Sequence, residues 1–314
     1  MSLVDNRKKF TFGRKLLSLL EGYYSAYLWT RDHVAPQEGS SIIDALKVAG
    51  YVKTISAIID NMRSSPRMTK VKKACRSFEL KGSDTGILFT HGFGANPEIF
   101  RDLAEYLNKE TGFTCRVLRL EGHGTSVQDM ERTTFLDWYK SVELHYKELS
   151  SKTKEIILLG HSMGSTLSLL FSVYNPCKAI ITISPPLDLP RPDAKFLPLI
   201  TWIKRYWPTK ESEAIKYRKR GHYIYPKRPL KCVTSMFDLM SVTRKRLHKV
   251  TAPLYTSVGL KDPRVPSNNI ELLLSSVSSS IKRADYFPQS THSIHLGPEK
   301  DKFKGNILAF IREL

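Results

Sequence analysis

A serine near the middle of the chain has the surroundings of a catalytic nucleophile. Ser162 is the central residue of a Gly-x-Ser-x-Gly pattern at 160–164, and four apolar residues, 156–159, lead directly into it. This order predicts a buried strand, a tight turn and a helix, with the serine hydroxyl at the apex of the turn. A Gly-rich turn with an incidental serine would give the same pattern, so other parts of the chain must decide.

A nucleophilic serine needs a base within hydrogen-bonding reach, and that base needs a carboxylate that fixes its tautomer. Asp262 follows the apolar segment 254–259, and His292 follows the segment 281–287. The order Ser, Asp, His along the chain is the one that accompanies a serine on a strand-to-helix turn. We therefore expect Ser162, Asp262 and His292 to form a catalytic triad. His295, three residues after His292, is an alternative base.

The same chemistry requires two backbone amides that bind a developing oxyanion. The amide of Met163, directly after the serine, is the first expected donor. The second should come from the His-Gly-Phe-Gly loop at 91–94, which follows the apolar segment 86–90. This loop provides the amide of Phe93, so we expect Phe93 and Met163 to form the oxyanion hole.

Several other residues could compete for roles in the site. His91, His123 and His161 are expected to be structural and to bond to backbone groups within their turns. Asp285 lies inside a predicted strand and Asp301 in a predicted terminal helix, so neither is expected to reach the site. Five of the aromatic residues at 187–250 fit either a small core of their own or contacts with an acyl chain. They are Trp202, Tyr206, Trp207, Tyr223 and Tyr225.

From residue 76 the chain alternates between short apolar runs and amphipathic segments. Strands are predicted at 76–80, 86–90, 115–119, 155–159, 178–184, 254–259 and 281–287. Helices are predicted at 98–109, 133–149, 165–174, 267–278 and 298–314. Such alternation predicts a mostly parallel sheet with helices on both faces. Functional residues of open α/β sheets lie beyond the carboxyl ends of the strands, where the candidate loops begin.

Two further segments lie outside this alternation. Residues 187–250 read as an insertion, rich in proline, aromatic and basic residues, with short helices around 195–206, 210–219 and 233–247. Residues 1–75 read as an N-terminal extension with amphipathic helices at 14–31 and 41–62 and a linker at 64–73. We therefore predict three parts: the extension 1–75, a core of 76–186 and 251–314, and the insertion 187–250.

The net charge of +19 is concentrated in these two segments. Residues 1–77 carry 14 basic and 6 acidic side chains, and residues 187–250 carry 16 and 5. A basic segment can contact an anionic membrane, nucleic acid or an acidic ligand, or it can only keep the surface soluble. The basic and aromatic extension fits peripheral contact with an anionic membrane, and packing on the core or on a second copy is the alternative.

Composition limits the class of protein. The longest apolar runs have about four residues, far too few for a membrane-spanning helix. The mostly apolar segment 16–20 is also too short to be the apolar region of a signal peptide. The four cysteines, Cys75, Cys115, Cys177 and Cys232, are widely spaced, which fits reduced thiols in a cytoplasmic protein and argues against a zinc site.

With these motifs the sequence resembles the α/β-hydrolase family, in the branch of carboxylesterases, monoacylglycerol lipases and serine aminopeptidases. The resemblance covers 76–314 and rests on His91-Gly92-Phe93, Glu121-Gly122-His123-Gly124, the 160–164 motif and the loops of Asp262 and His292. It implies an α/β-hydrolase fold, Ser162 as nucleophile, His292 as general base and Asp262 as its orienting partner. It implies no metal or organic cofactor, and a cap at 187–250 that shapes the substrate pocket. The extension and the basic charge of the cap depart from the family.

These observations predict a serine hydrolase that cleaves carboxylic esters, with a lipid-like monoester as substrate. The same triad could serve a thioesterase, an aminopeptidase or an acyltransferase. A membrane-docking or nucleic-acid-docking protein that uses the fold as a scaffold is the alternative from another class. An intact triad argues against a scaffold, and no nucleic-acid-reading motif is present, so nucleic acid is not an expected partner.

Overall fold

The chain divides into two compact units, Met1–Pro66 and Arg67–Leu314. The computed structural model describes residues 69–190, 204–209, 211, 215 and 223–314. The helices expected at 14–31 and 41–62 lie outside the described residues, as does most of 195–206 and 210–219. The linker expected at 64–73 is described from residue 69 onward. There the amide of Thr69 donates to the Asp129 carboxylate at 3.1 Å, and that of Lys72 donates to the Gly124 carbonyl at 3.0 Å.

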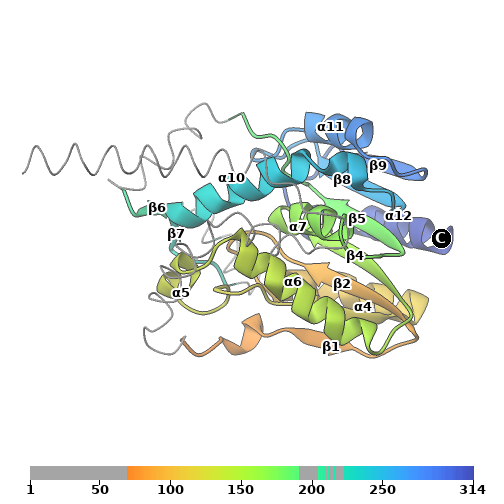
Figure 1. Ribbon diagram of the computed structural model, residues 1–314, viewed down its shortest axis with the longest axis horizontal. Helices are drawn as coiled ribbons and strands as arrows, with labels where there is room; N and C mark the ends of the chain where they lie inside the picture. The colour runs from red at the N-terminus through yellow and green to blue at the C-terminus, as the bar shows by residue number, and fades with distance from the viewer. Residues whose placement is uncertain (1–68, 191–203, 210, 212–214, 216–222) are drawn as a thin grey trace, which may run out of the picture. The chain divides into compact units, whose positions relative to one another are not determined.

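A seven-stranded sheet forms the centre of the second unit (Figure 1), in the order β1-β3-β2-β4-β5-β8-β9. Its strands are β1 (Phe78–Leu80), β2 (Thr85–Thr90), β3 (Thr114–Leu118), β4 (Glu155–His161), β5 (Ala179–Ile183), β8 (Leu254–Gly259) and β9 (Lys282–Phe287). All neighbours pair in parallel except β1, which runs antiparallel to β3. The expected mostly parallel sheet is therefore confirmed.

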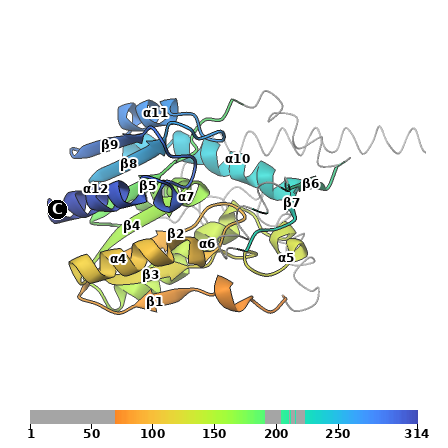
Figure 2. The same ribbon diagram turned by 180° about the vertical axis from the view of Figure 1, so that it is seen from behind.

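Helices cover both faces of the sheet, as the alternation predicts. α4 (Arg101–Thr111) and α12 (Lys300–Arg312) pack on one face, which is turned toward the viewer in Figure 2. α6 (Phe135–Ser150), α7 (Met163–Ser172) and α11 (Asn268–Ser276) pack on the other. β2, β4 and β5 are almost wholly buried, because a parallel sheet between two helical layers has no solvated face.

Short elements complete the core around the loops. The 3₁₀ turns are η1 (Lys73–Cys75), η2 (Pro97–Phe100), η4 (Leu247–Lys249) and η5 (Ile294–Leu296). The five-residue helix α5 (Val127–Glu131) was not expected from the sequence. Ser126 caps it, accepting the Asp129 amide while the Asp129 carboxylate accepts the Ser126 amide. A helix this short contains too few turns to show an apolar period, so its capping box was the available signal.

The described part of 187–250 contains one long helix and a small two-stranded sheet. The helix expected at 233–247 is α10 (Leu230–Arg244), which begins three residues earlier and packs against α6 and α7. β6 (Tyr206–Pro208) and β7 (Lys227–Pro229) form an antiparallel pair that was not expected. Tyr206 therefore lies in a strand rather than in the helix expected at 195–206. A three-residue strand gives no alternation that sequence reasoning could detect.

Polar contacts join this segment to loops of the core. The hydroxyl of the buried Tyr225 donates to the Gly122 carbonyl at 2.8 Å and accepts from the Thr125 amide at 3.1 Å. The Tyr206 hydroxyl donates to the Glu131 carboxylate at 2.8 Å, and Glu131 also accepts from a guanidinium of the same segment. Tyr225 thus joins the cap segment to the loop after β3, and its ring also packs edge-to-face on that of Tyr223 at 5.2 Å.

Candidate active site

The serine motif folds as the sequence predicts, with Ser162 between the last residue of β4 and the first residue of α7. Its backbone has φ 54° and ψ −126°, a strained combination for a residue with a side chain. The flanking glycines make this turn possible by close packing. A Cβ on Gly160 would lie 2.4 Å from the Gly164 carbonyl oxygen, and one on Gly164 only 2.0 Å from the Thr90 oxygen. No larger residue fits at either position.

The structure brings His292 and Asp262 together from loops that follow β9 and β8. Nδ1 of His292 donates to Oδ2 of Asp262 at 2.7 Å, and both side chains are almost fully buried. This donation leaves Nε2 of His292 unprotonated in the neutral ring, the form that can accept a proton. The two loops also pack closely, because a Cβ on Gly259 would lie 2.4 Å from the Ser290 carbonyl oxygen.

Asp262 is held in its ionised form by hydrogen bonds that outweigh its burial. Burial alone would raise the pKa of this carboxyl, but the bond from His292 and the backbone amides lower it below its ordinary value. Oδ1 accepts from the amide of Arg264 at 2.8 Å and from that of Val265 at 3.3 Å. A carboxylate fixed in this way can orient the ring of His292 and stabilise its cation.

The backbone of His292 is held in place by two side chains from neighbouring strand ends. Nε2 of His161 and Oγ of Ser184 each donate to the His292 carbonyl at 3.1 Å. The rings of His161 and His292 lie 4.9 Å apart between centroids. Ser184, directly after β5, has φ 48°, an uncommon conformation for a residue other than glycine. His161 thus bonds to the loop of His292, not within its own turn as expected.

The loop that carries Phe93 lies directly beside Ser162. A Cβ added to Gly92 would lie 3.0 Å from Cβ of Ser162, so the backbone of 91–94 passes close to the turn. The amide of Met163 opens α7, and the first amides of a helix have no partner within it. Both expected oxyanion donors therefore belong to segments that adjoin Ser162. The ring of Phe93 packs on Trp138 at 5.8 Å and on His123 at 6.3 Å.

The remaining histidines have neighbours that suit structural roles. Nδ1 of His91 donates to the Gly92 carbonyl and Nε2 accepts from the Leu120 amide. Nδ1 of His123 donates to the Glu121 carbonyl at 3.0 Å. Burial lowers the pKa of His91 well below its ordinary value and that of His123 to about 4. His295 lies in η5, buried, with its ring stacked on Phe100 at 5.1 Å.

The two acidic residues excluded from the site on sequence grounds lie in the elements expected for them. Asp285 is within β9, where its carboxylate accepts from the Tyr255 hydroxyl and from the Asn306 amide. Asp301 is in the first turn of α12. Across the residues that the structure describes, no three His, Cys, Asp or Glu side chains are arranged to hold a metal ion. All four cysteines are free thiols, and none belongs to the loops described above.

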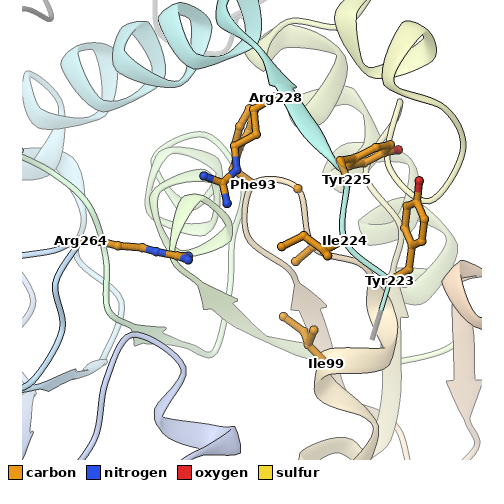
Figure 3. Close-up of a pocket in the computed structure, with 9 residues that line it drawn as sticks. Phe93, Ile99, Tyr223, Ile224, Tyr225, Arg228 and Arg264 are labelled. Carbon is orange, nitrogen blue, oxygen red and sulfur yellow. The ribbon is translucent and has the colours of Figure 1, made fainter. Parts of the chain in front are cut away.

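Two arginines beside the site were not anticipated. Arg264, two residues after Asp262, and Arg228, in β7, both line a cavity with Phe93 (Figure 3). The position of Arg264 in the loop after β8 was a signal that the sequence contained, because loops at the carboxyl ends of parallel strands converge. Arg228 gave no such signal, since it is one of many basic residues in its segment.

Comparison with known proteins identifies the family of the chain. The family model "Serine aminopeptidase, S33" matches residues 83–299. A thermostable monoacylglycerol lipase of Bacillus sp. (strain H-257) is 32% identical over 224 residues, which cover 71% of this chain and 88% of that protein. A carboxylesterase of Bacillus subtilis (strain 168) is 26% identical over 242 residues, covering 76% and 97% respectively.

Solved structures show the same fold. A structure from work on LipS and LipT, two metagenome-derived lipolytic enzymes, superposes with a TM-score of 0.71 at 25% identity, covering 78% of this chain and all of that one. A monoacylglycerol lipase of Paleococcus ferrophilus has a TM-score of 0.64 at 19% identity, with 75% and 97% covered. The chain therefore has the α/β-hydrolase fold and belongs to the serine aminopeptidase S33 family.

Proposed function

We propose that this protein is a serine hydrolase that cleaves carboxylic esters, with lipid-like monoesters as its substrates, through an acyl-enzyme on Ser162. One observation carries the proposal. The strained serine turn directly follows His161, which bonds to the His292 carbonyl, and His292 in turn forms a 2.7 Å hydrogen bond with Asp262. The relatives named as a monoacylglycerol lipase and a carboxylesterase support the choice of esters.

In the first half of the reaction, Nε2 of His292 takes the proton of Ser162 as Oγ attacks the ester carbonyl carbon. The carbonyl oxygen becomes an oxyanion that accepts hydrogen bonds from the Phe93 and Met163 amides. The tetrahedral intermediate then breaks its bond to the alcohol oxygen. His292 returns the proton to that oxygen, so a neutral alcohol leaves and the acyl group stays on Ser162.

In the second half, water replaces the alcohol. His292 takes a proton from the water as its oxygen attacks the acyl carbon, and the same two amides bind the second oxyanion. Collapse of this intermediate breaks the bond to Oγ, to which His292 donates the proton. A carboxylic acid leaves, and Asp262 stabilises the His292 cation in both halves without accepting its proton.

A panel of p-nitrophenyl esters of increasing acyl length, together with monoacylglycerols, tests this proposal. The wild-type protein should hydrolyse members of the panel, and Ser162→Ala should lower kcat by about 10⁴-fold or more. Thioesters and aminoacyl p-nitroanilides in the same panel test the thioesterase and aminopeptidase alternatives. Adding glycerol as an acceptor tests acyl transfer. Full activity of Ser162→Ala, or turnover of peptides but not esters, would contradict the proposal.

We also propose that the basic extension and the cap make peripheral contacts with anionic membrane surfaces. Residues 1–77 and 187–250 hold the whole excess of positive charge. None of the helices that the structure describes is long and apolar enough to cross a bilayer. Sedimentation with vesicles should show binding that increases with phosphatidylserine content and weakens with salt. Vesicle binding that depends on neither phosphatidylserine content nor salt concentration would argue against membrane contact. So would a salt-sensitive affinity for DNA instead of vesicles.

A further inference from the structure

A cavity beside the oxyanion loop is built from three separate parts of the chain. Phe93 and Ile99 come from the region after β2, Tyr223 and Arg228 from the segment at β7, and Arg264 from the loop after β8. Among the nine described residues that line it, two are arginines and none is acidic. Figure 3 shows Arg264 extending from its loop toward the same space that Arg228 and Phe93 face.

This cavity is next to the reacting groups. Phe93 provides one of the amides proposed to bind the oxyanion. The backbone amide of Arg264 donates to Asp262 at 2.8 Å, so the arginine belongs to the loop that carries the carboxylate. Its positive charge also contributes to the low pKa of His161, the residue before Ser162, after burial and two neighbouring histidines. The cavity therefore adjoins two segments of the proposed site, the oxyanion loop and the loop of Asp262.

The lining chemistry favours a negatively charged group. Two of the side chains that line this cavity end in positively charged guanidinium groups, which attract an anion more strongly than a neutral group. The planar fork of arginine matches the oxygens of a carboxylate or a phosphate, and such charge-assisted bonds are stronger than neutral ones. Each guanidinium has five N–H donors, so it can bind an anion with two and keep its contacts with the protein through the others.

We propose that this cavity binds an anionic group, a carboxylate or a phosphate, carried by the ester that reacts with Ser162. The inference rests on the proposed ester hydrolysis and narrows its substrates. The aromatic and apolar residues of the cavity, Phe93, Ile99 and Tyr223, pack against the carbon atoms between the anionic group and the ester. A monoester of this kind is an amphiphile with an anionic end, rather than a neutral glyceride.

Matched pairs of esters test the proposal with a neutral partner as internal reference. One pair places a carboxylate on the acyl part, p-nitrophenyl hemisuccinate against p-nitrophenyl butyrate. The other places a phosphate on the alcohol part, 1-acylglycerol 3-phosphate against 1-acylglycerol. The ratio of kcat/KM for the anionic member to that for the neutral member should exceed one in at least one pair. Which pair shows the preference identifies the carboxylate or the phosphate as the bound group.

Substitution then assigns that preference to the arginines. Arg228→Met and Arg264→Met should each lower the ratio by about 10-fold or more, the loss expected for one charge-assisted bond. Arg228→Lys and Arg264→Lys, which keep the charge but lose the fork, should lower it less. Lys227→Met and Lys261→Met are the matched controls and should preserve the ratio. Neither lysine lines the cavity, since Lys227 lies over the Tyr206 ring and Lys261 donates to Gln289.

The outcomes separate this inference from the proposed function. Hydrolysis of the neutral esters shows that a variant is folded and that the ester hydrolase is active. Neutral esters cleaved as fast as anionic ones, with a ratio that the arginine substitutions do not change, would overturn the inference and leave the function standing. Absence of hydrolysis of every ester by the wild-type protein would overturn both.

Discussion

At the scale of single residues, the account depends on how Asp262 and its neighbours fix the ring of His292. Both side chains are almost completely withdrawn from solvent, and Asp262 receives bonds from one ring nitrogen and two backbone amides. Each donor prefers the ionised carboxylate. In the proposed mechanism, the opposite ring nitrogen, Nε2 of His292, receives the serine proton.

Asp262→Asn should lower kcat by about 10³- to 10⁴-fold, because an amide can hold the ring in the wrong tautomer and cannot stabilise its cation. Steady-state kinetics with a p-nitrophenyl ester measures this loss. Asp285→Asn is the matched control, since this partly buried β9 carboxylate also accepts hydrogen bonds but lies outside the site. Its kcat should stay within about 2-fold of wild type at a temperature where the variant is folded. Equal losses in both variants would contradict the assignment.

Ser184 is a positioning residue in this account, because its hydroxyl holds the carbonyl of His292 at 3.1 Å. Ser184→Ala should lower kcat about 3- to 10-fold with little change in KM, the effect of one lost hydrogen bond on the base. The matched control is Ser168→Ala on α7, a buried hydroxyl with no hydrogen-bond partner among the described residues. That variant should keep its kcat. A change in KM without a change in kcat for Ser184→Ala would argue against a role of Ser184 in positioning His292.

At the scale of elements, the strand–turn–helix unit of β4 and α7 places the serine. α7 is buried along its length, and its first turn lies directly on the end of β2. Contact this close requires the absence of side chains at the crossing point. The elbow and the oxyanion loop after β2 are consequently one packed unit, and a change in either displaces the other.

Gly164→Ala should disrupt this unit, since its Cβ would lie 2.0 Å from the Thr90 carbonyl oxygen. We expect a loss of stability of about 2 kcal/mol or more together with loss of ester hydrolysis. Gly305→Ala in α12 is the control, because a Cβ there meets nothing within 4 Å among the described residues. It should raise the free energy of unfolding by up to about 1 kcal/mol. Urea denaturation measures the free energy of unfolding of both variants and the wild type. A Gly164→Ala variant with the stability and activity of the wild type would contradict the close packing.

At the scale of the whole molecule, buried neutral histidines couple stability to pH. Burial keeps the pKa of His91 and His161 well below the ordinary value and that of His123 at about 4. In the unfolded chain these residues take up protons near pH 6.5. Below that pH the unfolded state binds more protons than the native state, so the free energy of unfolding falls as the pH is lowered.

The urea midpoint should therefore decrease steadily from pH 6.5 to about 4. The ring of His91 lies 5.0 Å from that of His123 between centroids, and the positive charge of Arg119 adds to burial in lowering the pKa of His123. His123→Gln should make the decrease shallower by up to about 1.4 kcal/mol per pH unit, because one titrating group is removed. Denaturation at pH 7.5, 6 and 4.5 measures the slope. Equal slopes for the two proteins would contradict the role of His123.

The sequence predicted the core well because its buried strands read as continuous apolar runs. The run before Ser162 became β4, and the loops expected after β8 and β9 hold Asp262 and His292 where the fold class requires. Contacts between segments distant in the chain could not be predicted. The bond of His161 to the His292 carbonyl spans 131 residues, and Arg228 lines the same cavity as Phe93 only through the placement of β7. Such pairings depend on tertiary packing, which local patterns do not encode.

Covalent labelling tests the central claim, that Ser162 is a nucleophile activated by His292, most directly. The wild-type protein is treated with a fluorophosphonate, and peptide mass spectrometry locates the adduct. We expect one adduct, on the peptide that contains Ser162, and none in Ser162→Ala. Labelling should be slowed by several orders of magnitude in His292→Ala and little changed in His295→Ala. An adduct on another residue, or equal labelling of the wild type and His292→Ala, would contradict the account.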